Sequence, residues 1–218
     1  TTSAMEQLAL GLGYAHSDVG KVWHWLEQEL SRQTEQGSIP QLQAGQSCTP
    51  PFHSILAWTC WKKDPSSARI EELFDALLQS HHYWYLHRDS QELGLPCIQF
   101  AEEAVIPDSY QNDDAPFQIQ DPAFLGLLCR ANECLIEIGE KLHRDLSDLI
   151  QWHELTVFGL NEDLWDESFK SYCGFDLISG QKLGNTILAN YLPLWAGVPD
   201  QELAEEICRN LIKKYLLA

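Results

Sequence analysis

Apolar side chains recur at helical intervals along most of this 218-residue chain. Between Asp18 and about Glu35, the residues Val22, Trp23 and Leu26 recur at intervals typical of one helix face. Asp18 stands just ahead of them, where a side-chain oxygen can accept a hydrogen bond from the first turn. The pattern therefore predicts a helix that begins directly after Asp18.

The same period predicts further helices, separated by Pro, Gly and Asp residues. We expect helices over residues 52–61, 68–87, 121–143, 146–162, 183–191 and 201–217. The helix from 121 is well marked, because Asp121 can cap it and Pro122 fits its first turn. The aromatic stretch from 164 to 178 is predicted to form a small β-hairpin.

Residues 91–120 lack a sustained period and contain Gly94, Pro96, Pro107 and Pro116. We expect this stretch to be mostly irregular. An irregular connection of this length inside a compact domain often carries function. The chain as a whole is expected to be all-α, with helical hairpins packed side by side. The pattern leaves two arrangements open, an extended solenoid and a closed toroid of inner and outer helices.

The formal net charge is -18, from 32 acidic and 14 basic side chains. A chain with so little positive charge is a poor partner for nucleic acid or for an anionic membrane. The seven cysteines form no Cys-x-x-Cys pair, so we expect free thiols and a cytoplasmic protein. The chain has no apolar run of signal-peptide type, but its first residue is not Met, and a removed signal peptide stays open as the alternative.

A carboxylate-rich segment lies inside the irregular stretch, at residues 100–114. Its acids are Glu102, Glu103, Asp108, Asp113 and Asp114. Glycoside hydrolysis uses one carboxylic acid to protonate the leaving oxygen and one carboxylate as base or nucleophile. An acidic surface loop without chemistry is the alternative interpretation.

Other kinds of site find little support in the sequence. His81, His82 and His87 lack carboxylates at a spacing that would complete a metal site, and we expect no metal and no cofactor. The chain contains neither a nucleophile elbow nor a phosphate-binding glycine loop.

Several short motifs, in order along the chain, resemble one enzyme family. They are residues 36–40 (Gln-Gly-Ser-Ile-Pro), 49–52 (Thr-Pro-Pro-Phe), 88–89 (Arg-Asp), 120–124 (Gln-Asp-Pro-Ala-Phe), 164–167 (Leu-Trp-Asp-Glu) and 192–199 (Leu-Pro-Leu-Trp-Ala-Gly-Val-Pro). Together they resemble the inverting glycosidases that include mannosylglycerate and glucosylglycerate hydrolases. These enzymes are related to processing α-glucosidase I and, more distantly, to trehalase.

The resemblance implies that residues 1–218 form a single partial catalytic domain, about half of a six-fold α/α toroid. Its C-terminal half, with the general base, is expected to be missing from this chain. Asp108 corresponds to the general acid. The residues implied to line or support the sugar pocket are Trp84, Arg88, Glu103, Tyr110, Trp165 and Asp166.

Two departures from the family pattern weaken a catalytic interpretation. The family carries its acid in a Glu-Ser-Gly-x-Asp-x-Ser-Pro loop, whereas here the loop reads Glu-Ala-Val-Ile-Pro-Asp-Ser-Tyr over 103–110, with Asp108 shifted by one position. The family also has Thr-Gln-Pro-Pro where this chain has Cys-Thr-Pro-Pro over 48–51.

Two functions therefore stay open. The first is an inverting α-glucosidase or α-mannosidase acting on a small carbohydrate substrate, or the N-terminal portion of such an enzyme. The second is a non-catalytic helical module that binds a carbohydrate or a protein. A half toroid exposes a broad apolar flank, so we expect either a second copy of the chain or the missing half as its partner.

Overall fold

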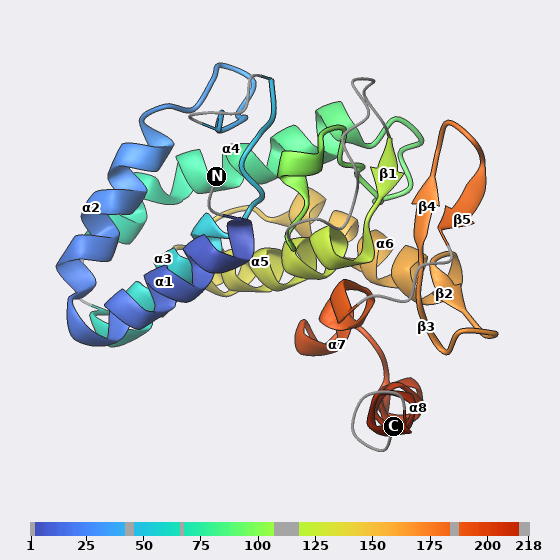
Figure 1. The fold of residues 1–218 in the computed structure, drawn as a ribbon. Helices are drawn as coiled ribbons and strands as arrows, with labels where there is room; N and C mark the ends of the chain where they lie inside the picture. Colours follow the sequence, from blue (N-terminus) through green and yellow to red (C-terminus); the bar gives the residue numbers. More distant parts are fainter. Residues whose placement is uncertain (1–2, 42–45, 66–67, 107–117, 184–187, 214–218) are drawn as a thin grey trace.

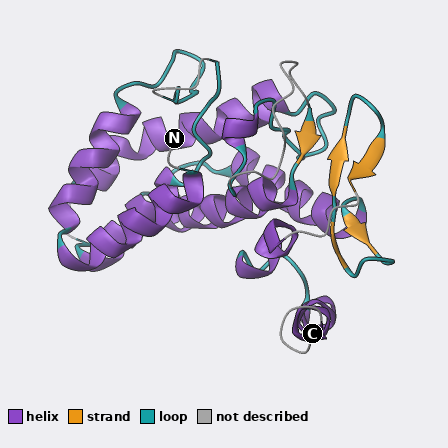
Figure 2. Ribbon diagram, viewed as in Figure 1, coloured by secondary structure: helices purple, strands orange, loops and turns teal. Residues whose placement is uncertain are grey.

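The computed structural model describes residues 3–41, 46–65, 68–106, 118–183 and 188–213 (Figures 1 and 2). Most of these residues are helical. The α-helices are α1 (Ala4–Ser17), α2 (Val19–Leu30), α3 (His53–Lys63), α4 (Arg69–Arg88), α5 (Pro122–Lys141), α6 (Ser147–Glu162), α7 (Leu192–Trp195) and α8 (Gln201–Leu211). The described loops also contain two short 3-10 helices, η1 (Ala101–Glu103) and η2 (Leu188–Tyr191).

Among the described residues, five short strands form two small sheets at one end of the helical body, on the right in Figure 1. The strands are β1 (Ile119–Gln120), β2 (Trp165–Asp166), β3 (Ser171–Tyr172), β4 (Gly174–Asp176) and β5 (Gln181–Leu183). β4 lies between β1 and β5 in an antiparallel three-stranded sheet, and β2 pairs antiparallel with β3. The expected hairpin is therefore present as part of a more extended β-region.

Side-chain caps start the helices where the sequence predicts them. The Asp18 carboxylate accepts a hydrogen bond from the backbone N–H of Lys21 at 3.1 Å, and α2 begins at the next residue. Asp121 accepts from the backbone N–H of Ala123 at 2.8 Å, and Pro122 is the first residue of α5. Both caps satisfy amide groups that lack a partner within the helix.

Helix α5 is the centre of the core. In its first half, from Pro122 to Cys129, every residue is buried, and the helix packs against α3, α6 and α7. Gly126 allows the close approach of α7, because a Cβ atom there would lie 3.0 Å from the backbone nitrogen of Pro193. The first half of α5 therefore lies in the interior with other helices packed around it, whereas the polar residues Arg130, Glu133, Glu137 and Glu140 leave one face of its second half toward the surface.

The structure corrects two sequence-based expectations. Helix α1 was not predicted, although Ser3 and Glu6 form a capping box at its start. The helix predicted over 183–191 is wrong at its beginning, because Leu183 ends β5 and pairs with Gly174 of β4. Strand pairing outweighs the local apolar pattern there. In the part of the chain that the structure describes, no helix is long and apolar enough to cross a membrane.

Candidate functional site

The described segments that carry predicted site residues lie at one end of the helical body. Helix α4 ends there, α5 begins there and α6 ends there, next to both sheets (Figure 1). The Lys182 side chain of β5 donates a hydrogen bond to the backbone oxygen of Trp165 at 2.8 Å, which joins the two sheets. Ile98 forms a bridge with Ile119, which in turn pairs with Asp176 of β4. Arg88, Glu103 and Trp165 therefore lie at the same end of the molecule.

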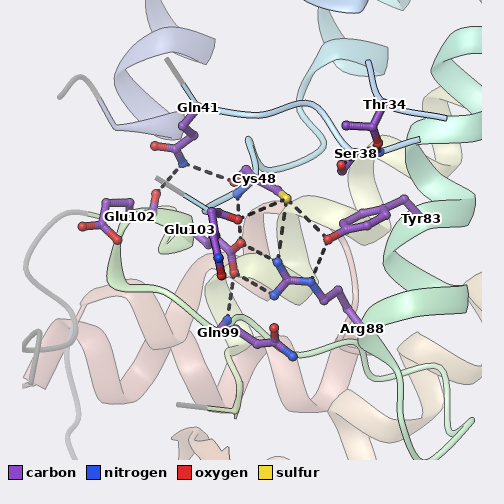
Figure 3. Close-up of polar contacts among 10 residues, drawn as sticks. Thr34, Ser38, Gln41, Cys48, Tyr83, Arg88, Gln99, Glu102 and Glu103 are labelled. Carbon is purple, nitrogen blue, oxygen red and sulfur yellow. Dashed lines mark hydrogen bonds and ion pairs between the residues drawn. The ribbon is translucent and has the colours of Figure 1, made fainter. Parts of the chain in front are cut away.

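Glu103 has no exposed surface, and its carboxylate is surrounded by donors (Figure 3). Oε1 accepts the backbone N–H of Cys48 at 2.9 Å, and Oε2 accepts the backbone N–H of Gln99 at 2.8 Å. The Arg88 guanidinium donates through Nη2 to Oε1 at 2.8 Å and through Nη1 to Oε2 at 3.2 Å. Each oxygen of this carboxylate therefore accepts one hydrogen bond from the guanidinium and one from a backbone amide, all from groups of the protein itself.

Arg88 is itself buried, with an exposed fraction of 5%. Its Nε donates to the Tyr83 hydroxyl at 2.9 Å, and Nη2 lies 3.7 Å from the Cys48 sulfur. The Tyr83 hydroxyl lies 3.4 Å from the same sulfur, so Arg88, Tyr83 and Cys48 form a closed group (Figure 3). The guanidinium carbon also lies 5.4 Å from the ring centre of Trp84.

Burial dominates the electrostatics of this group. It raises the pKa of the Glu103 carboxyl above its usual value, while the Arg88 guanidinium and the two backbone amides act against that shift. Burial also raises the pKa of the Tyr83 hydroxyl to about 12, so Tyr83 is neutral at physiological pH. The group is arranged to hold one positive and one negative charge together.

Trp84 lies in the core, with an exposed fraction of 2%. Its ring packs against Phe124 of α5, with the ring centres 4.6 Å apart. It also contacts the Tyr83 ring at 5.5 Å, edge to face. The side chain therefore supports the end of α4 from within the protein.

Trp165 and Asp166 form β2 and are both partly exposed. Trp165 packs edge to face on Tyr172 of the paired strand. The Asp166 carboxylate accepts hydrogen bonds from the backbone amides of Ser168 at 2.9 Å and Phe169 at 3.2 Å, and from the Ser168 hydroxyl. The Ser168 hydroxyl is the main reason that the pKa of Asp166 is lowered. Asp166 thus caps its own turn and keeps surface toward solvent.

Asp108 and Tyr110 lie in residues 107–117, outside the described residues. Within the described ranges, no group of three or more His, Cys, Asp or Glu side chains is placed to hold a metal ion. His81, one of the histidines near the end of α4, is buried and bonds through Nδ1 to the backbone oxygen of Leu77 at 3.1 Å.

Comparison with known proteins identifies the family. The sequence model of one protein family, described as the mannosylglycerate hydrolase MGH1-like glycoside hydrolase domain, matches residues 9–216. The chain belongs to this family. A mannosylglycerate hydrolase from Rubrobacter radiotolerans is 34% identical over 99 residues, which are 45% of this chain and 22% of that protein.

Solved structures of the glycoside hydrolase family 63 (GH63) share the fold. The mannosylglycerate hydrolase from Thermus thermophilus in complex with Tris superposes with a TM-score of 0.82 at 21% identity, covering 93% of this chain and 68% of that one. The glucose complex of the same enzyme gives a TM-score of 0.82 at 23% identity, covering 93% and 66%. The toroid-type fold expected from the sequence is confirmed. This member of the MGH1-like family spans about two thirds of those chains, and its aligned segment about a fifth of the Rubrobacter relative.

Sequence reasoning missed three residues that complete the group around Glu103: Tyr83, Cys48 and Gln99. Two of them contribute through the backbone, and Cys48 lies 55 residues from Glu103 along the chain. The Cys-Thr-Pro-Pro motif at 48–51 pointed to this segment, but it did not indicate the contact with Glu103. Asp89 stood out in the sequence only as part of a motif. Its carboxylate accepts the backbone N–H of Gly94 at 2.6 Å and thereby holds the turn that follows α4.

Proposed function

We propose that this chain is the sugar-binding and acid-bearing portion of an inverting glycoside hydrolase that acts on a small α-glucoside or α-mannoside. The observation that carries the proposal is the match of the glycoside hydrolase domain model to nearly the whole chain, from 9 to 216. Complexes of the Thermus thermophilus enzyme with glucose, and with Tris and D-glycerate, make a small glycoside or glycerate conjugate a reasonable substrate class. Residues 1–218 are proposed to act as one partial toroid domain.

The proposed reaction needs two carboxyl groups on opposite sides of the glycosidic bond. Asp108 gives its proton to the leaving oxygen while the bond to the anomeric carbon breaks. A carboxylate outside this chain removes a proton from water, which attacks the opposite face and inverts the configuration. The two groups must lie roughly 6.5 to 9.5 Å apart to leave room for that water.

The other predicted residues divide into two sets by their surroundings. Trp165 and Asp166 keep exposed surface at the loop end of the fold and are proposed to contact the sugar, together with Tyr110. Trp84, Arg88 and Glu103 are buried and are proposed to support the pocket. All seven cysteines fall within the described residues and are free thiols, which supports a cytoplasmic location as part of this proposal.

Sugar release from α-glucosides and α-mannosides, including glycerate conjugates, by the enzyme that contains this chain together with the general base tests the proposal. Proton NMR should detect the β-anomer of the sugar first, since inversion of an α-glycoside produces it. Asp108→Asn should lower kcat by about 10²- to 10⁴-fold, the usual contribution of a general acid. Asp113→Asn, in the same acidic segment, is the matched control and should retain activity. Equal losses in both variants, or release of the α-anomer first, would argue against this mechanism.

A non-catalytic carbohydrate-binding module is the second candidate. The displacement of Asp108 by one position from the family motif favours it. It predicts that the folded chain binds glucose or mannose in calorimetry, but that the enzyme containing this chain releases no sugar from any member of the panel. Hydrolysis lost in Asp108→Asn alone would exclude this candidate.

A further inference from the structure

Glu103 connects three separate segments of the chain. Its carboxylate binds the backbone of Cys48 in the loop before α3, the guanidinium of Arg88 at the end of α4, and the backbone of Gln99 just before η1. The Gln41 side chain adds a parallel link, since its Nε2 donates to the backbone oxygens of Cys48 at 3.2 Å and Glu102 at 2.7 Å. The three segments are thus joined by side chain and backbone together (Figure 3).

The described residues on either side of Asp108 both lie beside this junction. On the N-terminal side η1 ends at Glu103, and on the C-terminal side the described structure resumes at residue 118, just before β1. Ile119 of β1 exchanges two backbone hydrogen bonds with Ile98, at 2.9 and 3.0 Å. Ile98 adjoins Gln99, whose amide donates to Glu103. Glu103 and Ile119, which come before and after Asp108 in the sequence, are therefore both hydrogen-bonded to the backbone of residues 98–99.

We infer that Arg88 and Glu103 are positioning residues, whose ion pair locks the loops at the sugar-binding end rather than contacting the sugar. Both charges are buried and Glu103 has no exposed surface, which leaves no accessible acceptor for a sugar hydroxyl. A buried ion pair contributes little net stability compared with apolar packing, but it specifies one arrangement when all its hydrogen bonds are made. Here that arrangement is the relative position of three loops. The inference rests on the proposed function only in treating this end as the sugar-binding end.

Hydrogen exchange measures the lock directly and does not depend on catalysis. The amides of Cys48 and Gln99 both donate to Glu103, so they report whether the lock is closed. Glu103→Gln keeps the side-chain shape but loses the charge that pairs with Arg88. We expect exchange of these two amides to become at least about tenfold faster in this variant.

Two Tyr→Phe variants on α4 provide a matched comparison. Tyr83→Phe removes the hydroxyl that accepts from Arg88. Tyr85→Phe removes another buried hydroxyl, which is bonded to Thr156 at 3.0 Å and to Asn132 at 2.7 Å and takes no part in the lock. Faster exchange of the Cys48 and Gln99 amides in Tyr83→Phe alone supports the lock. Equal effects of both variants, or unchanged exchange in Glu103→Gln, would overturn it.

Steady-state kinetics separate positioning from sugar contact. A positioning role predicts that Glu103→Gln lowers kcat by about tenfold or more while KM changes by less than about twofold. A raised KM with unchanged kcat would make Glu103 a sugar contact and overturn the inference. These kinetics are measured on the enzyme that contains this chain together with the general base. If that wild-type enzyme releases no sugar, the proposed function fails, and the exchange experiment alone decides whether the lock exists.

Discussion

Glu103 and Asp166 are two predicted site carboxylates at the same end of the molecule, but the protein holds them in opposite ways. The donors to Glu103 come from segments 55, 15 and 4 residues away, and its side chain is completely buried. The donors to Asp166 come from Ser168 and Phe169, within its own turn, and it remains partly exposed. Burial raises the pKa of Glu103, whereas hydrogen bonds from Ser168 lower that of Asp166.

The difference separates the residues that maintain the fold at this end from those that are free to meet a ligand. A carboxylate with distant donors couples loops together, and its removal affects the whole molecule. A carboxylate with local donors shapes one turn, and its loss leaves the rest of the fold intact. Variants at the two positions should therefore differ in stability far more than their similar chemistry suggests.

The largest expected effect is the loss of stability in Glu103→Ala. This change leaves the Arg88 guanidinium buried without a counter-charge and the amides of Cys48 and Gln99 without an acceptor. Breaking a buried ion pair from one side costs about 3 to 5 kcal/mol of unfolding free energy. Urea denaturation followed by circular dichroism measures this loss as a lower midpoint.

Asp75→Ala is the matched control for that variant. Asp75 also pairs with an arginine, Arg144, but both side chains are largely exposed. Exposed pairs contribute about 0 to 1 kcal/mol, so the midpoint should change little. Similar losses in the two variants would remove the contrast between buried and exposed carboxylates.

The pH dependence of stability extends the comparison of buried with exposed groups to a second buried side chain, His81 of α4. Burial lowers the pKa of His81 to about 3, and its Nε2 has no hydrogen-bond partner among the described residues. In the unfolded chain His81 gains its proton near pH 6.5, while in the folded chain it stays neutral. The unfolding free energy therefore keeps its full value above about pH 6.5 and falls by about 1.4 kcal/mol per pH unit as the pH drops toward 3.

His81→Asn should make the stability curve flatter between about pH 6.5 and 4.5. Measurement of urea midpoints at several pH values gives the slope. Asp166→Asn should leave the slope in this window unchanged, because an aspartate with a lowered pKa titrates only below about pH 4. An identical slope for His81→Asn and the wild type would show that another group dominates the acid sensitivity.

The elements that the sequence predicts best are those with local causes. Asp121 and Pro122 mark the start of α5 because a cap and a first-turn proline act within a few residues. The start of the helix predicted at 183 is wrong, because the pairing of Leu183 with Gly174 depends on a neighbouring strand. The environment of Glu103 could not be predicted from the sequence either, because the fold has to bring Cys48 and Arg88 together around it.

The smallest expected effect belongs to Asp166, where two substitutions separate charge from hydrogen bonding. Asp166→Asn keeps an oxygen that accepts from the amides of Ser168 and Phe169, and should change the unfolding free energy by less than about 0.5 kcal/mol. Asp166→Ala removes that acceptor and should cost about 1 kcal/mol, as the loss of a capping side chain does.

The pH dependence of the Asp166→Asn variant tests the charge separately. The charged form of Asp166 stabilises the folded state above about pH 4, and this contribution is lost as the pH falls through the pKa of Asp166 in the folded protein. The unfolding free energy of the Asn variant should therefore match that of the wild type in strong acid. Because the Asn variant stays folded, any loss of sugar binding or release in it reports on the carboxylate itself. An Asn variant as unstable as Glu103→Ala would instead mean that Asp166 holds distant parts of the fold together.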